Sequence, residues 1–186
     1  MCGIAGFIGN GGFDTGKAMI SAIAYRGPDY QGVALHDNVC LSHARLSIID
    51  LSADANQPMY SRDKKVALVF NGEIYNFQAL KEQLLKTGKY QFETTSDTEV
   101  LLYLYQEYGR EMLKHIHGMF VFALYDFEQK ILWLARDRMG KKPLYYCTCM
   151  DGTFVFASEL KAVMMHPSVK KDINVEALNQ YLTFDY

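Results

Sequence analysis

The chain opens with Met1-Cys2-Gly3-Ile4-Ala5-Gly6, in which a cysteine directly follows the first methionine. The small residues here suit removal of Met1 during processing. Cys2 would then carry both its thiol, with an ordinary pKa of about 8.5, and a free α-amine, with an ordinary pKa of about 8. One residue would therefore supply a nucleophile and a base that both work at neutral pH. A cysteine at position 2 also arises by chance, so the rest of the chain has to decide between these interpretations.

The opening stretch also begins an apolar run that ends at a Gly/Asn-rich turn, which predicts a first strand. Similar apolar runs bounded by turn residues predict strands over residues 2–8, 32–36, 39–46, 66–70, 119–126, 130–137, 143–149 and 153–158. The run at 66–70 is followed by Asn71-Gly72-Glu73, which predicts a turn. The short polar linkers between the last four strands predict antiparallel hairpins.

Apolar residues at helical spacing predict helices between these strands, over residues 14–25, 76–87, 96–108, 160–165 and 175–182. Asp14 or Thr15 is the expected cap of the first helix. Ser96 and Glu99 have the spacing of a capping box, and Leu85 is expected on the inner face of the helix over 76–87. Several strands are apolar on both faces. The pattern therefore predicts an α+β fold in which two antiparallel sheets stack on each other between outer helices, four layers in the order α-β-β-α.

Composition predicts one globular domain spanning residues 1–186. The hydrophobic fraction is 49% and the charged fraction 22%, as in ordinary soluble proteins. The net charge of −2 gives no electrostatic case for a nucleic acid or an anionic membrane as partner. No apolar run approaches the ~18 residues needed to span a bilayer, and no signal peptide opens the chain. A cytoplasmic protein is expected.

The cysteine pattern argues against a disulfide scaffold and against a metal site. The chain has 4 cysteines, Cys2, Cys40, Cys147 and Cys149, too few for a disulfide-stabilised fold of this size. Cys147 and Cys149 lack the spacing of zinc ligands and have no matching second pair. We therefore expect no metal, and both cysteines are interpreted as packed or surface thiols.

Short motifs spread over almost the whole chain resemble those of one enzyme family. They are Cys2-Gly3-Ile4-Ala5-Gly6, Arg26-Gly27-Pro28-Asp29, His43-Ala44-Arg45-Leu46-Ser47-Ile48-Ile49-Asp50, Gln57-Pro58-Met59, Asn71-Gly72-Glu73-Ile74-Tyr75-Asn76, Ser96-Asp97-Thr98-Glu99, Arg136-Asp137-Arg138-Met139-Gly140-Lys141-Lys142-Pro143-Leu144-Tyr145-Tyr146 and Phe156-Ala157-Ser158-Glu159-Leu160-Lys161. In this order they resemble the N-terminal glutaminase domain of asparagine synthetases, a class II glutamine amidotransferase. The resemblance implies the N-terminal-nucleophile hydrolase fold, which agrees with the four layers expected above.

The resemblance also implies a reaction, the hydrolysis of the glutamine side-chain amide to glutamate and ammonia. Cys2 would be the nucleophile that forms a γ-glutamyl thioester, with its own α-amine as the proton shuttle. Asn71 and Gly72 match the family's oxyanion hole, through a side-chain amide and a backbone N–H respectively. An ordinary Asn-Gly turn is the competing interpretation. The catalytic role of Cys2 depends on loss of Met1, because a peptide nitrogen cannot act as a base.

Recognition of glutamine is also implied residue by residue. Arg45 matches the clamp for the substrate carboxylate, and a guanidinium fork suits that planar anion. Asp97 matches the group that receives the ammonium, although an acidic residue in a first helical turn is favourable in any case. The rest of the predicted substrate site consists of residues from two loops, Leu46, Ile48, Ile49, Asn71, Gly72 and Glu73.

Other polar residues receive lesser roles. His43 is either an accessory group next to the substrate loop or a packed histidine that steadies it. Arg26 is expected to clamp the N-terminal segment. Gly140-Lys141-Lys142 lacks the Walker pattern of a phosphate loop, and the resemblance implies a hairpin turn there.

The family resemblance implies partners that this sequence does not contain. Asparagine synthetases continue into a domain that activates aspartate with ATP and carries a Ser-Gly-Gly-x-Asp-Ser loop, which is absent here. ATP and Mg²⁺ are therefore expected only in that domain, and no cofactor in this one. The chain stops at residues 181–186, where the interdomain linker would begin, as expected of an isolated domain, a truncated product or a stand-alone glutaminase. A C-terminal synthetase domain or separate synthetase, glutamine as substrate, and a homodimer of the full-length protein are the expected partners.

Alternatives remain open at this point. The chain could be a module that binds glutamine or docks a partner without turnover. It could also be a different N-terminal-nucleophile amide hydrolase, although the pair Arg45 and Asp97 favours an α-amino acid substrate. Aspartate is the expected acceptor of the ammonia, and other carboxylates are amidated by relatives of the family.

Overall fold

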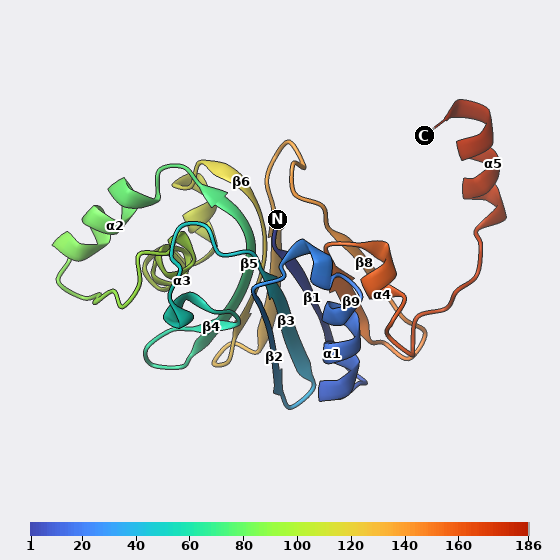
Figure 1. Cartoon of the computed structure of the whole chain (residues 1–186), viewed down its shortest axis with the longest axis horizontal. Coiled ribbons are helices and arrows are strands. Elements are labelled where there is room, and N and C mark those ends of the chain that lie inside the picture. The colour runs from blue at the N-terminus through green and yellow to red at the C-terminus, as the bar shows by residue number, and fades with distance from the viewer. Residues whose placement is uncertain (186) are drawn as a thin grey trace.

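Two antiparallel β-sheets stack on each other at the centre of the molecule, with helices on both outer faces (Figure 1). The computed structural model describes residues 1–185. The first sheet contains, in spatial order, β2 (Tyr30–His36), β3 (Val39–Arg45), β1 (Gly3–Ile8), β9 (Phe154–Ala157) and β8 (Tyr145–Thr148). The second sheet contains β4 (Met59–Tyr60), β5 (Val66–Ile74), β6 (Gly118–Asp126) and β7 (Ile131–Arg136).

The helices form the two outer layers. Those on the first sheet are α1 (Phe13–Ser21) and α4 (Leu160–Val163), and those on the second sheet are α2 (Phe77–Lys86) and α3 (Asp97–Tyr108). Short 3₁₀ turns occur at Ala24–Arg26, Ala53–Ala55 and Gly109–Lys114. The structure confirms the predicted α+β class and the order of four layers.

Each pair of neighbouring layers encloses a separate apolar core. The core between the sheets consists of residues that alternate along the central strands, Ile4, Leu41, Ala67, Val69, Val121, Ala123 and Phe156. The intervening residues of the same strands face outward, as Phe7 does toward α1 and Phe70 toward α3. Burial on both faces explains why these strands are apolar at nearly every position.

Strand β1 lies in the middle of the first sheet and sets the position of the N-terminus. It pairs antiparallel with β3, with Gly3 opposite Ala44, and with β9, with Ala5 opposite Ala157. The start of β1 therefore lies beside the end of β3. Cys2, directly before β1, is brought next to Leu46, directly after β3.

The predicted turn at Asn71-Gly72-Glu73 is wrong, because β5 continues through these residues to Ile74. Asn71 lies opposite Val121 and Gly72 opposite Phe120 in an unbroken pairing with β6. The continuous pairing overrides the local turn preference. Glycine is required at position 72 for another reason, because a Cβ there would lie 2.3 Å from the Met119 carbonyl oxygen.

The prediction of hairpins between the last four strands is right for two connections and wrong for one. β6–β7 and β8–β9 are antiparallel hairpins. The connection over residues 137–144, expected to be a hairpin turn, instead crosses from β7 in the second sheet to β8 in the first. The carboxylate of Asp137 accepts the backbone N–H groups of Lys141 and Lys142, at 2.9 and 3.0 Å, and so shapes this crossing.

Helix α3 begins after Ser96 as predicted, but without the expected capping box. The Ser96 hydroxyl accepts the N–H of Thr98 at 3.1 Å. The Glu99 carboxylate does not return to the cap and instead accepts the N–H groups of Glu93 and Thr94, at 2.9 and 2.7 Å. Glu99 therefore stabilises the segment before the helix, and not the cap that its spacing predicts.

Two smaller helix predictions are also wrong. Helix α1 begins after Gly12, so neither Asp14 nor Thr15 is its cap. On α2, Leu85 points outward and is 47% exposed, because the helix packs through its Leu80 and Leu84 face.

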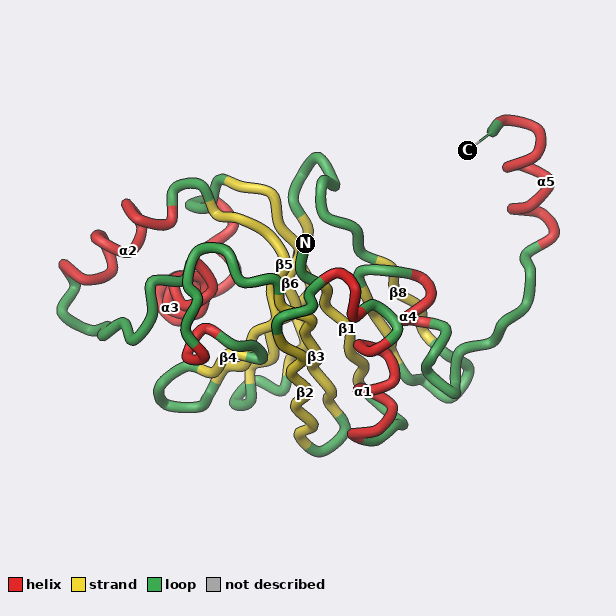
Figure 2. Tube along the Cα trace, in the orientation of Figure 1, coloured by secondary structure: helices red, strands yellow, loops and turns green. Residues whose placement is uncertain are grey.

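The C-terminal helix α5 (Val175–Phe184) projects away from the rest of the molecule (Figures 1 and 2). Every residue of it is exposed. It covers most of the segment expected to begin a linker, and Tyr186, the last residue of that segment, lies outside the described residues. Over residues 1–185, no helix has the length and apolarity needed to cross a membrane.

The core between the sheets generates a stability prediction. Phe156 is fully buried and lies opposite Gly6, whose missing side chain leaves room for the Phe156 ring. Phe156→Ala is expected to lower the free energy of unfolding by about 3–5 kcal/mol, because it leaves a cavity that the stacked sheets cannot close. Urea denaturation measures this, with Met150→Ala, at an 89% exposed residue, as the control expected to change little.

Candidate active site

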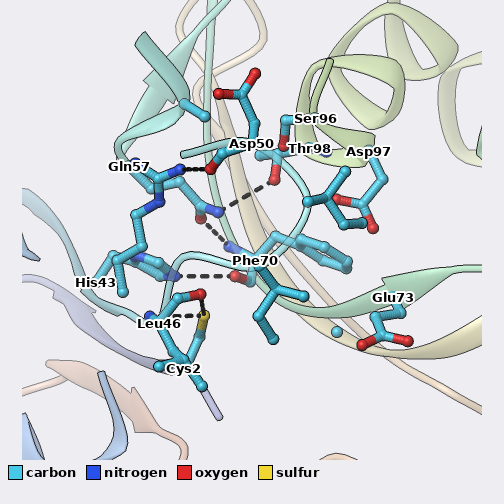
Figure 3. Close-up of a pocket in the computed structure, with 15 residues that line it drawn as sticks. Cys2, His43, Leu46, Asp50, Gln57, Phe70, Glu73, Ser96, Asp97 and Thr98 are labelled. Carbon is cyan, nitrogen blue, oxygen red and sulfur yellow. Dashed lines mark hydrogen bonds between the residues drawn. The ribbon is translucent and has the colours of Figure 1, made fainter. Parts of the chain in front are cut away.

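The Cys2 thiol lies at the junction of β1 and β3, in contact with the backbone of Leu46. Its Sγ accepts the Leu46 N–H at 3.3 Å and lies 3.5 Å from the Leu46 carbonyl oxygen (Figure 3). Burial raises the pKa of the thiol above its ordinary value, and the Leu46 contact and the positive charges of the chain's α-amine, Arg45 and Lys142 act in the opposite direction. The thiol is therefore protonated at neutral pH unless a base takes its proton.

Arg26 holds the N-terminal segment in place, as predicted. Its Nε donates to the Cys2 carbonyl oxygen at 2.9 Å, and its Nη1 forms an ion pair with Glu159 at 2.8 Å. Because Glu159 follows β9, this chain of contacts attaches the residue before β1 to the end of the neighbouring strand.

A cleft opens beside Cys2 between the ends of β3 and β5 and the start of α3 (Figure 3). About 470 Å³ of space inside it is free of protein atoms, open solvent at its mouth included. The predicted site residues that line it are Cys2, Arg45, Leu46, Ile48, Ile49, Gly72, Glu73 and Asp97. The structure thus brings together residues from four motifs that are up to 95 positions apart in the sequence.

Asn71 is the one predicted residue that does not line the open cleft. It lies next to Gly72 on β5 and is 2% exposed, on the same face of the strand as Val69, which packs between the sheets. Its side-chain Nδ2 is buried without a hydrogen-bond partner among the described residues. A buried, unpaired donor costs about 1–3 kcal/mol. The amide is therefore free to receive an acceptor oxygen.

The peptide before Asn71 is held on both sides by side chains. β4 pairs with β5 only as far as Leu68, so the backbone of Phe70 has no strand neighbour on that edge. The Phe70 N–H donates to Gln57 Oε1 at 2.6 Å, and His43 Nε2 donates to the Phe70 carbonyl oxygen at 3.1 Å (Figure 3). Gln57 in turn donates to the hydroxyl of Thr98 at 3.1 Å. β5 is thereby fixed just before the two predicted oxyanion donors.

The state of His43 favours the packed rather than the accessory interpretation. Burial lowers the pKa of His43 to about 3, so the ring is neutral at physiological pH. Its Nε2 carries the proton that bonds to Phe70, and its Nδ1 is buried without a partner within residues 1–185. A group with so low a pKa is a weak base near neutrality.

Arg45 is held by the loop that follows β3. Its Nη1 donates to the Ser52 carbonyl oxygen and to Asn56 Oδ1, both at 2.7 Å, and its Nη2 donates to the Asp50 carbonyl oxygen. A guanidinium has five N–H donors. Two therefore remain without a partner in the described part of the chain and can bind an anion that enters the cleft.

The same loop is tied to the segment before α3 by the side chain of Asp50. Its carboxylate accepts the N–H and hydroxyl of Thr95, at 2.8 and 3.0 Å, and the N–H and hydroxyl of Ser52, at 2.8 and 2.6 Å. The hydrogen bonds from Ser52 and Thr95 lower the pKa of Asp50 well below its ordinary value. Asp50 therefore stays ionised and closes the loop around Arg45.

Two carboxyl groups, Asp97 and Glu73, both line the side of the cleft away from Leu46 (Figure 3). Asp97 is 4% exposed and accepts the Ile74 N–H at 3.0 Å. Burial raises the pKa of Asp97 to about 6, and the charge of Glu73 acts in the same direction. This side of the cleft favours a cation.

Three polar residues of the family motifs, Gln57, Thr98 and Asp50, have contacts at the site that the sequence did not predict. They line the cleft and hold β5 and the Arg45 loop. A polar residue beside a proline or inside a cap has many ordinary explanations, so only the fold reveals what it bonds to. The free cysteines Cys147 and Cys149 lie half-buried against the face of the first sheet that α1 covers, and neither lines the cleft.

The model of the glutamine amidotransferase domain family matches residues 1–186. Asparagine synthetase B (glutamine-hydrolyzing) of Escherichia coli strain K12 is 48% identical over 140 residues, which is 75% of this chain and 25% of that protein. Asparagine synthetase (glutamine-hydrolyzing) 3 of Bacillus subtilis strain 168 is 37% identical over 191 residues, 97% of this chain and 30% of that protein.

These relatives are much longer than this chain, which spans between 25% and 30% of their length. Among solved structures, glutamine phosphoribosylpyrophosphate amidotransferase from B. subtilis, complexed with ADP and GMP, is similar with a TM-score of 0.78. The similarity covers 90% of this chain and 44% of that one at 22% identity, and it shows a common fold.

The buried carboxyl of Asp97 generates a stability prediction. A carboxyl whose pKa is raised from 3.8 to about 6 on folding destabilises the folded state once the pH exceeds both values. Asp97→Asn is therefore expected to raise the free energy of unfolding at pH 7.5 by about 1–2 kcal/mol, because the amide oxygen keeps the Ile74 hydrogen bond without the buried charge. Denaturation of both proteins from pH 7.5 to pH 4.5 measures this. A gain that does not shrink as the pH falls would contradict it.

Proposed function

This chain belongs to the glutamine amidotransferase domain family, and we propose that it hydrolyses the side-chain amide of glutamine to glutamate and ammonia. The observation that carries the proposal is the position of the Cys2 thiol, in a cleft with a free Arg45 edge and a buried carboxyl of Asp97. A thiol nucleophile, an anion-binding group and a cation-binding group are what an α-amino acid amide requires.

Loss of Met1 is the first requirement of the proposed mechanism. In the described chain the α-amine belongs to Met1, and the nitrogen of Cys2 is a peptide nitrogen. Removal of Met1 places a basic amine on the same residue as the thiol. Because burial raises the pKa of that thiol, a base this close is needed to form the thiolate.

Attack of the thiolate on the amide carbon forms the C–S bond and places negative charge on the carbonyl oxygen. The Asn71 amide and the Gly72 N–H are the proposed donors to that oxygen. The unpaired state of Asn71 Nδ2 supports this role, since an oxyanion supplies the missing acceptor. The proton taken by the α-amine passes to the leaving nitrogen, which departs as ammonia. Water then hydrolyses the γ-glutamyl thioester by the same path.

The ends of glutamine are recognised by opposite charges in this proposal. The two unused N–H groups of Arg45 bind the substrate carboxylate. Asp97, with Glu73 beside it, binds the ammonium. The backbone around Leu46 and the side chains of Ile48 and Ile49 form the wall of the cleft, and Ile48 is 61% exposed, open to an entering substrate.

The ammonia is proposed to serve a synthetase. The two relatives with 48% and 37% identity are asparagine synthetases, and this chain spans 25% and 30% of their length. We infer an ATP- and Mg²⁺-dependent partner domain or subunit with aspartate as the acceptor, and other carboxylates as the alternative. The hydrolysis itself uses a thiol, an amine and hydrogen-bond donors from this chain and needs no cofactor. A cytoplasmic location remains a prediction.

The proposal predicts that Cys2 alone reacts. Purified protein lacking Met1, as verified by mass spectrometry of the N-terminus, is expected to release glutamate from glutamine, and Cys2→Ala to lose this activity entirely. A glutamine-analogue diazoketone is expected to label Cys2. Cys147→Ala serves as the matched control with full activity. Labelling of Cys40, Cys147 or Cys149 would contradict the assignment, and glutamine binding without turnover would favour a binding module.

The proposal also predicts an acid limb in the pH profile. Asp97 binds the substrate ammonium only when ionised, and its pKa in the free protein is about 6. The value of kcat/KM for glutamine is therefore expected to fall as the pH drops through about 6, mainly through KM. Asp97→Asn is expected to lose about 10- to 10²-fold in kcat/KM, as for a charge-assisted bond, and to lack this limb. Steady-state rates from pH 5 to pH 8 measure both effects.

A further inference from the structure

Lys142 is a buried cation beside the N-terminus that the proposed mechanism does not use. It lies in the crossing between β7 and β8 and is 5% exposed. Its Nζ contacts the thioether sulfur of Met1 at 3.4 Å. None of the ion pairs formed among residues 1–185 includes it. Its neighbour Lys141 is exposed, as lysines ordinarily are.

The backbone holds Lys142 in this inward position. Its N–H donates to the Asp137 carboxylate at 3.0 Å, and its carbonyl oxygen accepts from Arg136 Nε at 2.6 Å. A thioether is a weak acceptor, and an ammonium taken out of water without a carboxylate costs several kcal/mol. An apolar side chain would fill the same space without the cost of burying an ammonium. That cost therefore indicates that the charge of Lys142 has an electrostatic role at the N-terminus.

The other cations around Cys2 are held by partners elsewhere, whereas the Lys142 ammonium lies against Met1 and its charge acts on Cys2. Arg26 also contacts Cys2, through the carbonyl oxygen, but its charge is paired with Glu159. Arg45 donates to the loop that follows β3. On the acidic side, Glu73 and Asp97 lie across the cleft, on the second sheet and α3. The group that contacts the first residue itself is Lys142.

We propose that Lys142 is a positioning residue which, once Met1 has left, holds the freed α-amine of Cys2 unprotonated at neutral pH. The inference rests on the proposed function. A second positive charge beside the ammonium is disfavoured, so the amine stays a free base and can take the thiol proton. When the amine then carries that proton, the same repulsion favours its transfer to the leaving nitrogen. Removal of Met1 both exposes the amine and removes the thioether that contacts Lys142.

The test measures the ionisation of the Cys2 α-amine directly and does not depend on turnover. The rate of carbamylation of this amine by cyanate is followed against pH, with the product located by peptide mass spectrometry in protein shown to lack Met1. Lys142→Met removes the charge at nearly constant length. The midpoint of the profile is expected to rise by about 0.5–1 pH unit, as for loss of one nearby charge. Lys141→Met, the same change at the exposed neighbour, is expected to leave it unchanged.

Further variants separate charge from packing. Lys142→Arg is expected to keep the midpoint close to the parent value, and Lys142→Gln to reproduce the shift if Lys142→Met does not fold. An unchanged midpoint in a folded Lys142→Met or Lys142→Gln protein would overturn the inference and leave Lys142 a structural residue. If no variant hydrolyses glutamine but the midpoint still shifts, the inference stands and the proposed function fails.

Discussion

The antiparallel pairing of β1 with β3 is the constraint on which the site depends. This pairing brings Cys2, the residue before β1, next to Leu46, the residue after β3, and the Cys2 sulfur contacts the Leu46 backbone. β3 then continues into the loop that holds Arg45. Because β1 lies between β3 and β9, and packs on the second sheet through Ile4, the thiol is held by a central strand of the core rather than by a free end.

In and around the cleft, burial leaves three groups in unfavourable states. Asn71 has an unpaired donor, Asp97 a raised pKa, and Lys142 an ammonium without a carboxylate. Each lowers the stability of the folded protein, and each has a partner in the proposed reaction: an oxyanion for Asn71, an ammonium for Asp97 and the neutral amine of Cys2 for Lys142. The stacked sheets supply the stability that makes these states tolerable, which is the usual relation between a rigid scaffold and a reactive site.

Contacts with distant parts of the chain explain why three predictions from local sequence are wrong. Asn71-Gly72 has the composition of a turn, yet nine residues of pairing with β6 keep it extended. Glu99 has the spacing of a capping box, yet it bonds the segment before the helix. The crossing after β7 looks like another hairpin, yet it joins the two sheets. In each case the competing partner comes from a distant part of the chain, which local sequence does not reveal.

The sequence by itself determined the class of fold, the two sheets with their outer helices, and most of the residues that line the cleft. Apolar runs that are buried on both faces and the short linkers between them encode the layers, and the motifs around Cys2, Arg45 and Asp97 identify the family. Only the tertiary structure decided what those residues contact. It gave Gln57 and His43 their role in holding β5, and it placed Lys142 beside the N-terminus. Hydrogen bonds and buried charges depend on which strands meet, and that is a property of the folded chain.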